Sequence, residues 1–443
     1  MEKIDVIYLY EHVARELDVA CAVKCIAEQH YGIRIELVHW PSGLPRAFSQ
    51  FRPRVVALTH CYSAGDYQPT LLEWRKSVFF NLAWEQLLCP ATRNHKMPSD
   101  EFSRKHVIHH AWSDFFANDL LDQGIPGQNI FINGHPAYML YEEPYRQYFM
   151  QRLDLASQYH LDMNKRWIFF PENFGWAFLS DKQVQTDWLQ RGTSRDEADT
   201  MIRFARASLE EIMKWCVEMM THNSVELIIR PRPATPLNDF KVAVQQFIGV
   251  IPDRMHFIKE ESIREWIMAS DVVISSYSTS LIEAALAGKR AYLFEPYPIP
   301  KFLHSDWHDY IAHIKTQGEC TKACLNGFVN SDNDQLASWA RTTMQPRGDA
   351  IWNLAEFLAK ICQGEIQPPS LPNRKTVTKT GRFRLPKWAL YEYRRIRHQK
   401  LRRNAAVRIL RVHENDHLSP IAIEQRTNKW KSLLARNDNQ KSN

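Results

Sequence analysis

The sequence contains no apolar run of eighteen residues, and its first ten residues include Glu2 and Asp5 within a strand-like stretch. A membrane-spanning helix needs about 20 mostly apolar residues, and a secretory signal needs an uninterrupted apolar core near the start of the chain. We therefore expect neither a transmembrane helix nor a signal peptide. These absences favour a cytoplasmic protein.

Paired metal-ligand spacing is also missing. The eight cysteines are scattered, and Cys320 and Cys324 have no second pair to complete a zinc site. His109, His110 and His135 are predicted near strand ends, where a histidine is more often a hydrogen-bonded part of the scaffold than a ligand. We expect no bound metal and no cofactor, and the cysteine pattern fits a reducing compartment.

The net positive charge of the chain comes from its C-terminal part. The net charge is +6, but residues 371–411 contain fourteen Lys and Arg against one acid, for +13, and residues 412–443 contribute +1. Residues 1–370 therefore carry about −8. A body of this charge is not expected to bind nucleic acid.

Strand-like and helix-like patterns alternate through most of the sequence. Six short apolar runs occur before residue 133, and a second series of five begins at residue 167. This alternation predicts two doubly wound α/β domains that face a cleft, with ligands outside the carboxyl ends of the strands. Three prolines between residues 368 and 372 mark a linker. We expect an N-terminal domain over residues 1–143, a C-terminal domain over residues 144–366 and a basic, partly helical tail over residues 367–443.

No glycine-rich dinucleotide fingerprint and no Walker sequence occur, but residues 271–296 predict a strand, a hydroxyl-rich loop, a helix and a second strand. Unpaired N–H groups and the positive dipole at a helix N-terminus suit a phosphate. Glu283 is placed to accept hydrogen bonds from ribose hydroxyls. A capping box between Ser280 and Glu283 explains the same spacing and stays open. The candidate hydroxyls are Ser275, Ser276, Ser278, Thr279 and Ser280.

Two arginines follow the strand predicted at residues 225–229. In Arg230-Pro231-Arg232-Pro233 the prolines fix the backbone, and the two guanidiniums lie beyond the strand end. Arginine binds diphosphates and carboxylates in bidentate geometry. A solvated surface turn is the alternative. Asn173, in the loop after the strand at residues 167–170, is a further candidate on this side.

Charged side chains also gather after the first strand. A helix dipole explains an acid at Glu16, but it does not explain Glu11 and His12 in the turn before it, next to Arg15. Glu85 lies beside a tryptophan at another predicted strand end, where a raised pKa would suit a general base or acid. An ion-paired, structural Glu85 is the alternative.

Together these features resemble the GT-B glycosyltransferases of bacterial surface polysaccharide synthesis. The resemblance rests on Ser-Ser-x-Ser-Thr-x-Leu-Ile-Glu-Ala from residue 275, on Arg-Pro-x-Pro from residue 230, and on the blocks at residues 11–18, 81–86 and 171–175. The likeness is greatest to the "surface carbohydrate biosynthesis protein" group, which is related to Kdo- and sialic-acid-type transferases and to CDP-glycerol glycerophosphotransferases.

The resemblance implies that the C-terminal half binds a donor nucleotide without a metal. Ser278, Thr279 and Ser280 would contact phosphate, Glu283 the ribose, and Arg230 the phosphate or a sugar carboxylate. Related transferases have a histidine where this chain has Arg232. CMP, CDP, UDP and GDP therefore all remain candidates.

The function that the resemblance implies is transfer of a sugar, with Kdo and nonulosonates as candidates, from a nucleotide donor to a lipopolysaccharide or capsule acceptor. Glu85 is the first candidate for the base and Glu16 the second, with Glu11, His12 and Arg15 on the acceptor side. The alternatives are polyol-phosphate transfer from a CDP-polyol, epimerisation of a UDP-sugar, and a non-enzymatic protein that binds nucleic acid or membrane through its tail.

The basic stretch at residues 374–411 carries +13 and contains Phe383, Trp388, Tyr391 and Tyr393. Each Lys or Arg near an anionic membrane surface contributes about 1 kcal/mol, and aromatic rings favour the interface. We expect peripheral attachment to the anionic inner membrane. A solvated, partly disordered extension is the alternative.

Overall fold

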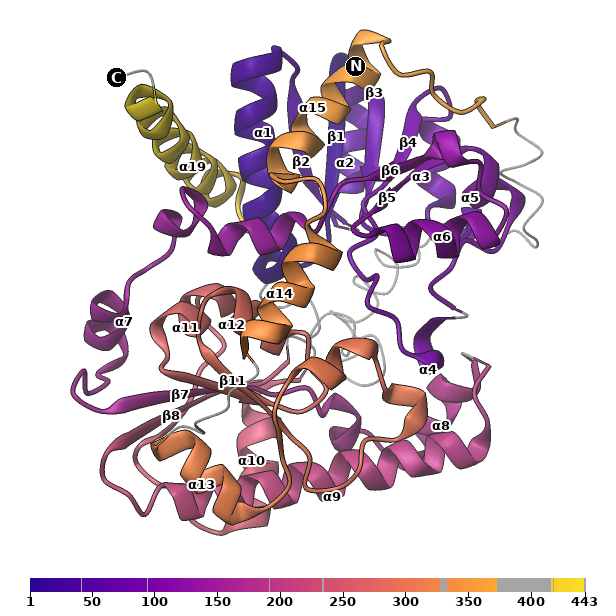
Figure 1. Ribbon diagram of the computed structural model, residues 1–443. Coiled ribbons are helices and arrows are strands. Elements are labelled where there is room, and N and C mark those ends of the chain that lie inside the picture. Colours follow the sequence, from indigo (N-terminus) through magenta and orange to yellow (C-terminus); the bar gives the residue numbers. More distant parts are fainter. Residues whose placement is uncertain are drawn as a thin grey trace, which may run out of the picture. The chain divides into compact units, whose positions relative to one another are not determined.

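The computed structural model describes residues 1–40, 42–93, 95–190, 192–232, 235–326, 333–372, 416 and 418–441. These residues form two compact units (Figure 1). Unit 1 comprises Met1–Gln86, Lys96–Tyr148 and the described residues from Thr343 onward. Unit 2 comprises Leu87–His95 and Phe149–Thr342.

Unit 1 is built on a parallel six-stranded sheet in the order β2-β1-β3-β4-β5-β6. Because β2 and β3 lie on opposite sides of β1, the strand order reverses between β1 and β3, and ligands bind at such a switch point in open α/β sheets. The strands are β1 (Glu2–Tyr10), β2 (Ile35–His39), β3 (Phe51–Leu58), β4 (Val78–Asn81), β5 (Val107–Ala111) and β6 (Ile130–Ile132).

Helices cover this sheet. A π-helical turn, η1 (Val13–Leu17), leads from β1 into α1 (Asp18–Tyr31), which ends where Gly32 adopts φ 66° and so satisfies the left-handed cap. The apolar face of α1 is fully buried, and α1 packs against both α15 and α19. The helices are α1, α2 (Leu44–Gln50), α3 (Gln68–Glu73), α5 (Glu101–Lys105), α6 (Asp114–Asp122), α15 (Ala350–Gln363) and α19 (Pro420–Lys441).

Unit 2 contains a second parallel six-stranded sheet, in the order β12-β11-β10-β7-β8-β9. Its first strand, β7, lies between β8 and β10, so the switch point is between β7 and β10. The strands are β7 (Arg166–Pro171), β8 (Val225–Arg230), β9 (Met255–Phe257), β10 (Val272–Ser275), β11 (Arg290–Phe294) and β12 (His313–Ile314).

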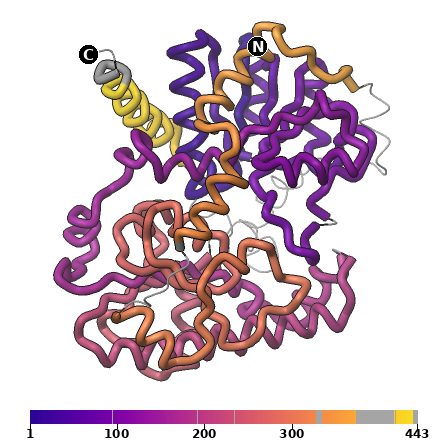
Figure 2. The backbone as a smooth tube through the Cα atoms, viewed as in Figure 1, coloured from indigo at the N-terminus to yellow at the C-terminus, as the bar shows by residue number. Residues whose placement is uncertain are grey.

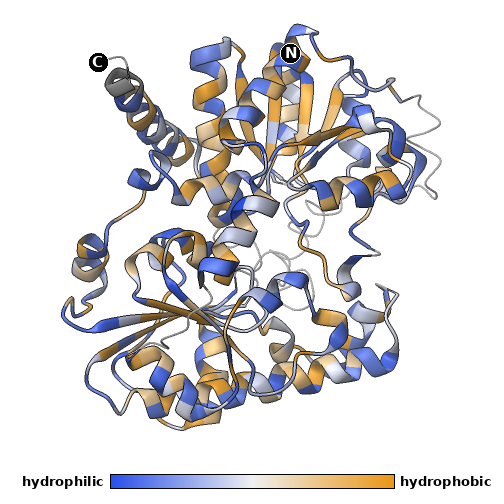
Figure 3. Cartoon of the chain, in the orientation of Figure 1, coloured by the Kyte–Doolittle hydropathy of each residue, from blue (hydrophilic) through white to orange (hydrophobic). Residues whose placement is uncertain are grey.

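The longest helix of unit 2, α9, shows how its sequence sets its position. Ser194 begins it with a capping box, in which Glu197 accepts the Ser194 N–H. Its apolar face is buried against the sheet, whose strands are largely hydrophobic in Figure 3. The helices are α4 (Pro90–Arg93), α7 (Arg152–Tyr159), α8 (Asp181–Gln190), α9 (Arg195–Met219), α10 (Leu237–Ile248), α11 (Ile263–Ala269), α12 (Ser280–Leu286), α13 (Gln317–Leu325) and α14 (Asn333–Met344).

The eleven strands predicted from the sequence all appear, and the doubly wound α/β class is confirmed. The membership of the C-terminal segments differs from the predicted domain boundaries. The sequence predicts residues 344–366 in the C-terminal domain and α19 in a separate tail, yet α15 and α19 both pack on α1 of unit 1. Figure 2 shows α19, in yellow, beside the indigo α1.

One ion pair and one aromatic stacking contact explain the position of α19. Arg426 forms a 2.8 Å ion pair with Asp18, which is almost fully buried at the start of α1. Trp430 is fully buried and stacks on Tyr148 at 4.0 Å between ring centroids. The predicted membrane-binding stretch, residues 374–411, lies outside the described residues. Within the described part of the chain no helix has the length and apolar character to cross a bilayer.

Candidate functional site

Three strand ends of unit 2 converge at its switch point. Glu172 and Asn173 follow β7, Ser276 follows β10, and Arg232 follows β8. The Ser275 hydroxyl donates to the Pro171 carbonyl at 2.6 Å and joins the ends of β7 and β10. Ser275 is therefore occupied within the scaffold.

Glu172 is the most unusual residue of this edge. Only 3% of its surface is exposed, and its backbone N–H donates to the Arg230 carbonyl at 2.9 Å. Oε2 accepts the Arg232 N–H at 3.3 Å, whereas Oε1 has no hydrogen-bond partner among the described residues. Burial raises the pKa of Glu172 to about 7, against the opposing charge of Arg232. Its carboxyl group therefore exchanges a proton near neutral pH.

Two nearby side-chain oxygens also lack a hydrogen-bond partner among the described residues. Asn173 Oδ1 and Ser276 Oγ are both buried and make no hydrogen bond to any described residue. Folded proteins leave few buried polar atoms unsatisfied, because each costs free energy. Three such atoms beside one switch point, on the loops after the neighbouring strands β7 and β10, mark a place where a polar ligand completes the hydrogen bonding.

The two predicted arginines have different positions. The Arg230 guanidinium is buried and donates to the carbonyls of Glu260 and Glu261 at 2.6 and 2.9 Å, and burial lowers its pKa to about 10. It holds the turn before α11. Arg232 is exposed, and its guanidinium lies against Gly175, where an added Cβ would be 3.3 Å from Nη1. Of the two arginines, Arg232 is the one whose cationic group is available at the switch point.

The hydroxyl loop before α12 is partly self-paired. Ser278 Oγ and Ser280 Oγ lie 2.9 Å apart, and the Ser280 N–H donates to Ser278 Oγ at 3.3 Å. Thr279 is the N-cap residue and is exposed, and its side chain makes no cap hydrogen bond. Ser280 is therefore the first residue of α12 and not its N-cap, the position that the alternative capping box with Glu283 requires. Glu283 is half-buried in the first turn.

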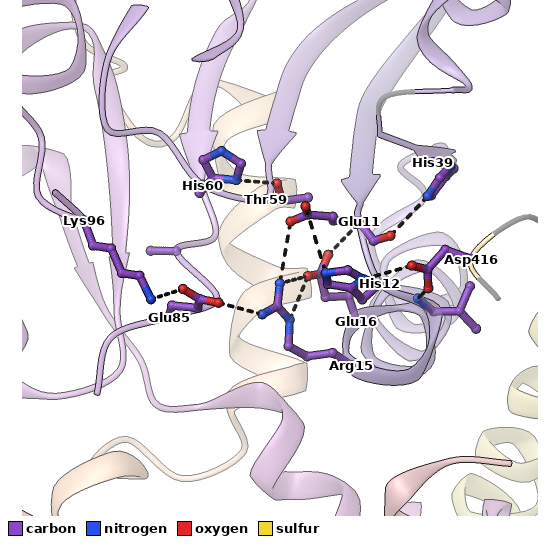
Figure 4. A network of polar contacts seen from close by, with 12 residues as sticks. Glu11, His12, Arg15, Glu16, His39, Thr59, His60, Glu85, Lys96 and Asp416 are labelled. Atoms are coloured by element: carbon purple, nitrogen blue, oxygen red, sulfur yellow. Dashed lines mark hydrogen bonds and ion pairs between the residues drawn. The ribbon is translucent and has the colours of Figure 1, made fainter. Parts of the chain in front are cut away.

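In unit 1, the residues predicted after β1 form one charged network (Figure 4). Glu16 is fully buried; its Oε2 accepts the Glu11 N–H at 2.7 Å, and its Oε1 accepts from Arg15 Nη2 at 2.5 Å. Arg15 Nη1 donates to Glu85 Oε1 at 3.1 Å, and Arg15 Nη2 lies 3.8 Å from Glu11 Oε2. The structure thus brings together all five predicted residues of the N-terminal half: Glu11, His12, Arg15, Glu16 and Glu85.

The two carboxylates considered as bases are not free to act in this arrangement. Burial alone would raise the pKa of Glu85, but its ion pairs with Lys96 and Arg15 hold that pKa far below the ordinary value. The raised pKa expected for Glu85 is therefore wrong, because the sequence does not reveal the two cations. Glu16 has a pKa raised by burial, but none of its surface is exposed.

His12 has a partner that sequence reasoning did not identify. Its Nδ1 is 2.9 Å from Oδ2 of Asp416, and Oδ1 of the same carboxylate accepts the Val13 N–H at 2.8 Å. The backbone beside it is held by His39, whose Nε2–H donates to the Glu11 carbonyl at 3.1 Å. No sequence signal links positions 404 residues apart.

The other histidines belong to the scaffold. His109 and His110 are buried inside β5, and burial lowers the pKa of each to about 4. His109 is held between Ser103 and Asn81, and His135 stacks on Trp112 at 3.7 Å. Among the described residues, no group of three or more His, Cys, Asp or Glu side chains is arranged to hold a metal ion.

Comparison with known proteins extends the description of the fold. No model of a known protein family matches the chain, and no curated protein does. Among solved structures, a variant of the wall teichoic acid polymerase TagF aligns with a TM-score of 0.52 and 8% identity, over 82% of this chain and 89% of that one. A UDP-N-acetylglucosamine 2-epimerase aligns at 0.51 with 10% identity, over 84% and 100%. S. aureus MnaA, in a UDP co-structure, aligns at 0.50 with 11% identity, over 84% and 100%.

These similarities and the two six-stranded parallel sheets give the chain a GT-B fold with two Rossmann-like units. The likeness at 8–11% identity concerns the fold. Function has to be argued from this chain's own site residues, because one fold serves many activities.

Proposed function

We propose that this protein is a glycosyltransferase that uses a nucleotide-activated sugar, and that the nucleotide binds at the carboxyl edge of β7 and β10 in unit 2. The observation that supports this most is the set of three buried polar atoms without a described partner: Glu172 Oε1, Asn173 Oδ1 and Ser276 Oγ. A site of this kind, with a carboxyl of strongly raised pKa, is a candidate ligand site on physical grounds.

In this proposal, each part of the edge has a separate role. Arg232 supplies positive charge for a phosphate, and the exposed Thr279 supplies a hydroxyl. Stabilising charge on the leaving phosphate is the main electrostatic contribution to the reaction. Glu283 remains the candidate for the ribose hydroxyls, while Arg230 and Ser275 support the loops.

The acceptor is proposed to bind unit 1 near the network of Glu11, Arg15 and Glu85. Arginine and carboxylate groups at a strand end suit the hydroxyls of a saccharide, because they donate and accept hydrogen bonds in fixed directions. A lipopolysaccharide or capsule acceptor, a cytoplasmic location and membrane contact through residues 374–411 complete the proposal.

A second candidate shares the same site. A UDP-sugar epimerase or a transferase of polyol phosphate would also need a nucleotide at the β7–β10 edge, and proteins with this fold include an epimerase and TagF. The products separate these activities. An epimerase needs no acceptor, glycosyl transfer adds a sugar to the acceptor, and polyol-phosphate transfer adds phosphorus.

The experiment is a thermal-shift screen of the full chain with CMP, CDP, UDP and GDP, followed by mass spectrometry of products formed from the corresponding activated sugars. A ligand that binds only the folded state raises the melting temperature. Ser276→Ala should reduce the shift given by the best nucleotide.

Ser270→Ala is the matched control, because Ser270 is equally buried in unit 2 but donates to the Trp266 carbonyl. It should lower the melting temperature without changing the nucleotide shift. No shift with any of the four nucleotides in the wild-type protein would contradict the proposal.

A further inference from the structure

Asp416 lies far from the network of unit 1 in sequence but is part of it in space (Figure 4). It follows the basic stretch and precedes α19, and only 5% of its surface is exposed. One carboxylate oxygen is 2.9 Å from His12 Nδ1, and the other accepts the Val13 N–H at 2.8 Å. Both oxygens are thus engaged at the carboxyl end of β1.

This geometry sets the tautomer of the neutral imidazole. A carboxylate accepts hydrogen bonds only, so the proton of neutral His12 is held on Nδ1 and Nε2 becomes the basic nitrogen. Nε2 lies 4.0 Å from Glu11 Oε1, and 19% of the His12 side chain is exposed. The ring therefore presents a basic nitrogen beside the switch point of the unit 1 sheet.

We propose that His12 is the catalytic base of the transfer reaction and that Asp416, supplied by the C-terminal segment, is its positioning residue. This inference rests on the proposed function. It replaces Glu85 and Glu16 as bases, since two cations lower the pKa of Glu85 so far that it is a poor proton acceptor, and Glu16 is inaccessible.

The proton and electron changes balance within one step. The acceptor hydroxyl oxygen forms a bond to the transferred sugar carbon, and its proton passes to His12 Nε2. The bond between that carbon and the nucleotide phosphate oxygen breaks, and its electron pair leaves with the phosphate. Asp416 stabilises the imidazolium that forms.

The charges around His12 set its proton affinity. Burial lowers its pKa, whereas the hydrogen bond to Asp416 raises it, Arg15 lowers it, and Glu11 and Glu16 raise it; the net result is a raised pKa. Because a base must be unprotonated, activity should rise with pH through the pKa of His12. The titratable and charged groups that act on its ring are Asp416, Arg15, Glu11 and Glu16, and His39 contacts the Glu11 carbonyl next to it.

A purely structural role for Asp416 makes different predictions. The C-terminal helix has its own anchor in the Arg426–Asp18 ion pair, at 2.8 Å. Arg426→Gln removes this anchor of α19 but leaves the two contacts of the Asp416 carboxylate, with His12 and Val13, in place. Asp416→Asn keeps the size of the side chain, but its amide can donate to Nδ1 and so favour the wrong imidazole tautomer.

The first measurement needs no substrate. The pKa of His12 is followed by NMR of the ¹⁵N-labelled imidazole in the full-length protein, with His12→Gln used to assign the signal. Asp416→Asn should lower this pKa, and Arg426→Gln should leave it unchanged. An unchanged pKa in Asp416→Asn would overturn the inference.

The second measurement is the pH profile of nucleotide release from a panel of CMP-, CDP-, UDP- and GDP-activated sugars. His12→Gln and Asp416→Asn should each lower kcat by roughly 10²–10⁴-fold, the range of general base catalysis, and Asp416→Asn should move the acid limb to lower pH. Equal losses in Asp416→Asn and Arg426→Gln, with no movement of the acid limb, would reduce Asp416 to an anchor and overturn the inference.

The two proposals fail in distinguishable ways. If the wild-type protein releases no nucleotide from any sugar of the panel, the proposed function fails and the catalytic role of His12 falls with it. If the wild-type protein is active and His12→Gln is equally active, only the assignment of the base is wrong.

Discussion

Replacing Glu172 by Gln should stabilise the protein at neutral and alkaline pH. The pKa of Glu172 is raised from 4.5 to about 7, so the folded protein keeps a proton there that the unfolded chain releases between those two pH values. Stability therefore falls as the pH rises through this window and stays lower above it. At about 1.4 kcal/mol for each pH unit, the free energy of unfolding lost is about 3 kcal/mol.

Gln has the shape of the protonated side chain and carries no charge. The substitution should therefore increase the free energy of unfolding by up to about 3 kcal/mol at pH 8 and change it little at pH 4.5. Urea denaturation at both pH values, followed by tryptophan fluorescence, measures the difference. Trp167, Trp188 and Trp266 are buried reporters within unit 2.

Glu226→Gln provides the control of opposite sign. Glu226 is also buried in unit 2, but it is paired with His256 at 2.7 Å and Lys165 at 3.3 Å, so its replacement should destabilise the protein. If Glu172→Gln is no more stable than the wild-type protein at pH 8, the carboxyl is not a strained group at this edge, and the argument for the site loses its electrostatic part.

Three further outcomes are expected. Trp430→Ala should lower the free energy of unfolding by about 3–5 kcal/mol, since this ring is fully buried and stacks on Tyr148. It should also expose the C-terminal helix to limited proteolysis. An unchanged cleavage pattern would contradict the packing of Trp430. Burial keeps His109 and His110 neutral and lowers the pKa of each to about 4, so unit 1 should lose stability as the pH falls from 6.5 toward 4. His110→Gln should reduce the difference in the free energy of unfolding between pH 7 and pH 5. An unchanged difference would argue against this. Neutralising the Lys and Arg of residues 374–411 should abolish sedimentation with anionic vesicles at low salt, and undiminished sedimentation would rule out the membrane role. Substitution is preferable to truncation at residue 373, because truncation would also remove Asp416 and α19.

The fold could be predicted because its signals are local. Eleven of the twelve strands described are short apolar runs, and the helices between them have the 3.6-residue period, so the type and order of these elements follow from the sequence. The sequence does not predict β12, because it is only two residues long, His313–Ile314. The assignment of α15 and α19 to unit 1 could not be predicted, since it depends on contacts between distant segments, such as Arg426 with Asp18 across 408 positions.

The sequence predicts the candidate site only as far as it predicts where the strands end. Reasoning from strand ends identified Asn173, Ser276 and Arg232, which the structure places at one switch point. It gave Arg230 a ligand role that the structure does not support directly, because the carbonyls of the following turn occupy its guanidinium. The raised pKa of Glu172 depends on burial, which a sequence does not specify.

In the unit 1 network, too, the pKa of a carboxyl group depends on charged neighbours that the sequence does not reveal. A carboxylate beside a tryptophan suggested a raised pKa for Glu85, but Lys96, which a loop brings back to it, reverses the direction. The sequence does not reveal the role of Asp416, because its partner His12 is near the other end of the chain.

Amide hydrogen exchange of the full-length protein, with and without the nucleotide that gives the largest thermal shift, tests the central claim most directly. If the nucleotide binds at the β7–β10 edge, backbone amides of residues 172–176 and 275–280 should exchange more slowly when it is present, because the bound ligand makes local opening of these two loops less frequent. Protection confined to unit 1, with unchanged exchange at these two loops, would contradict the account.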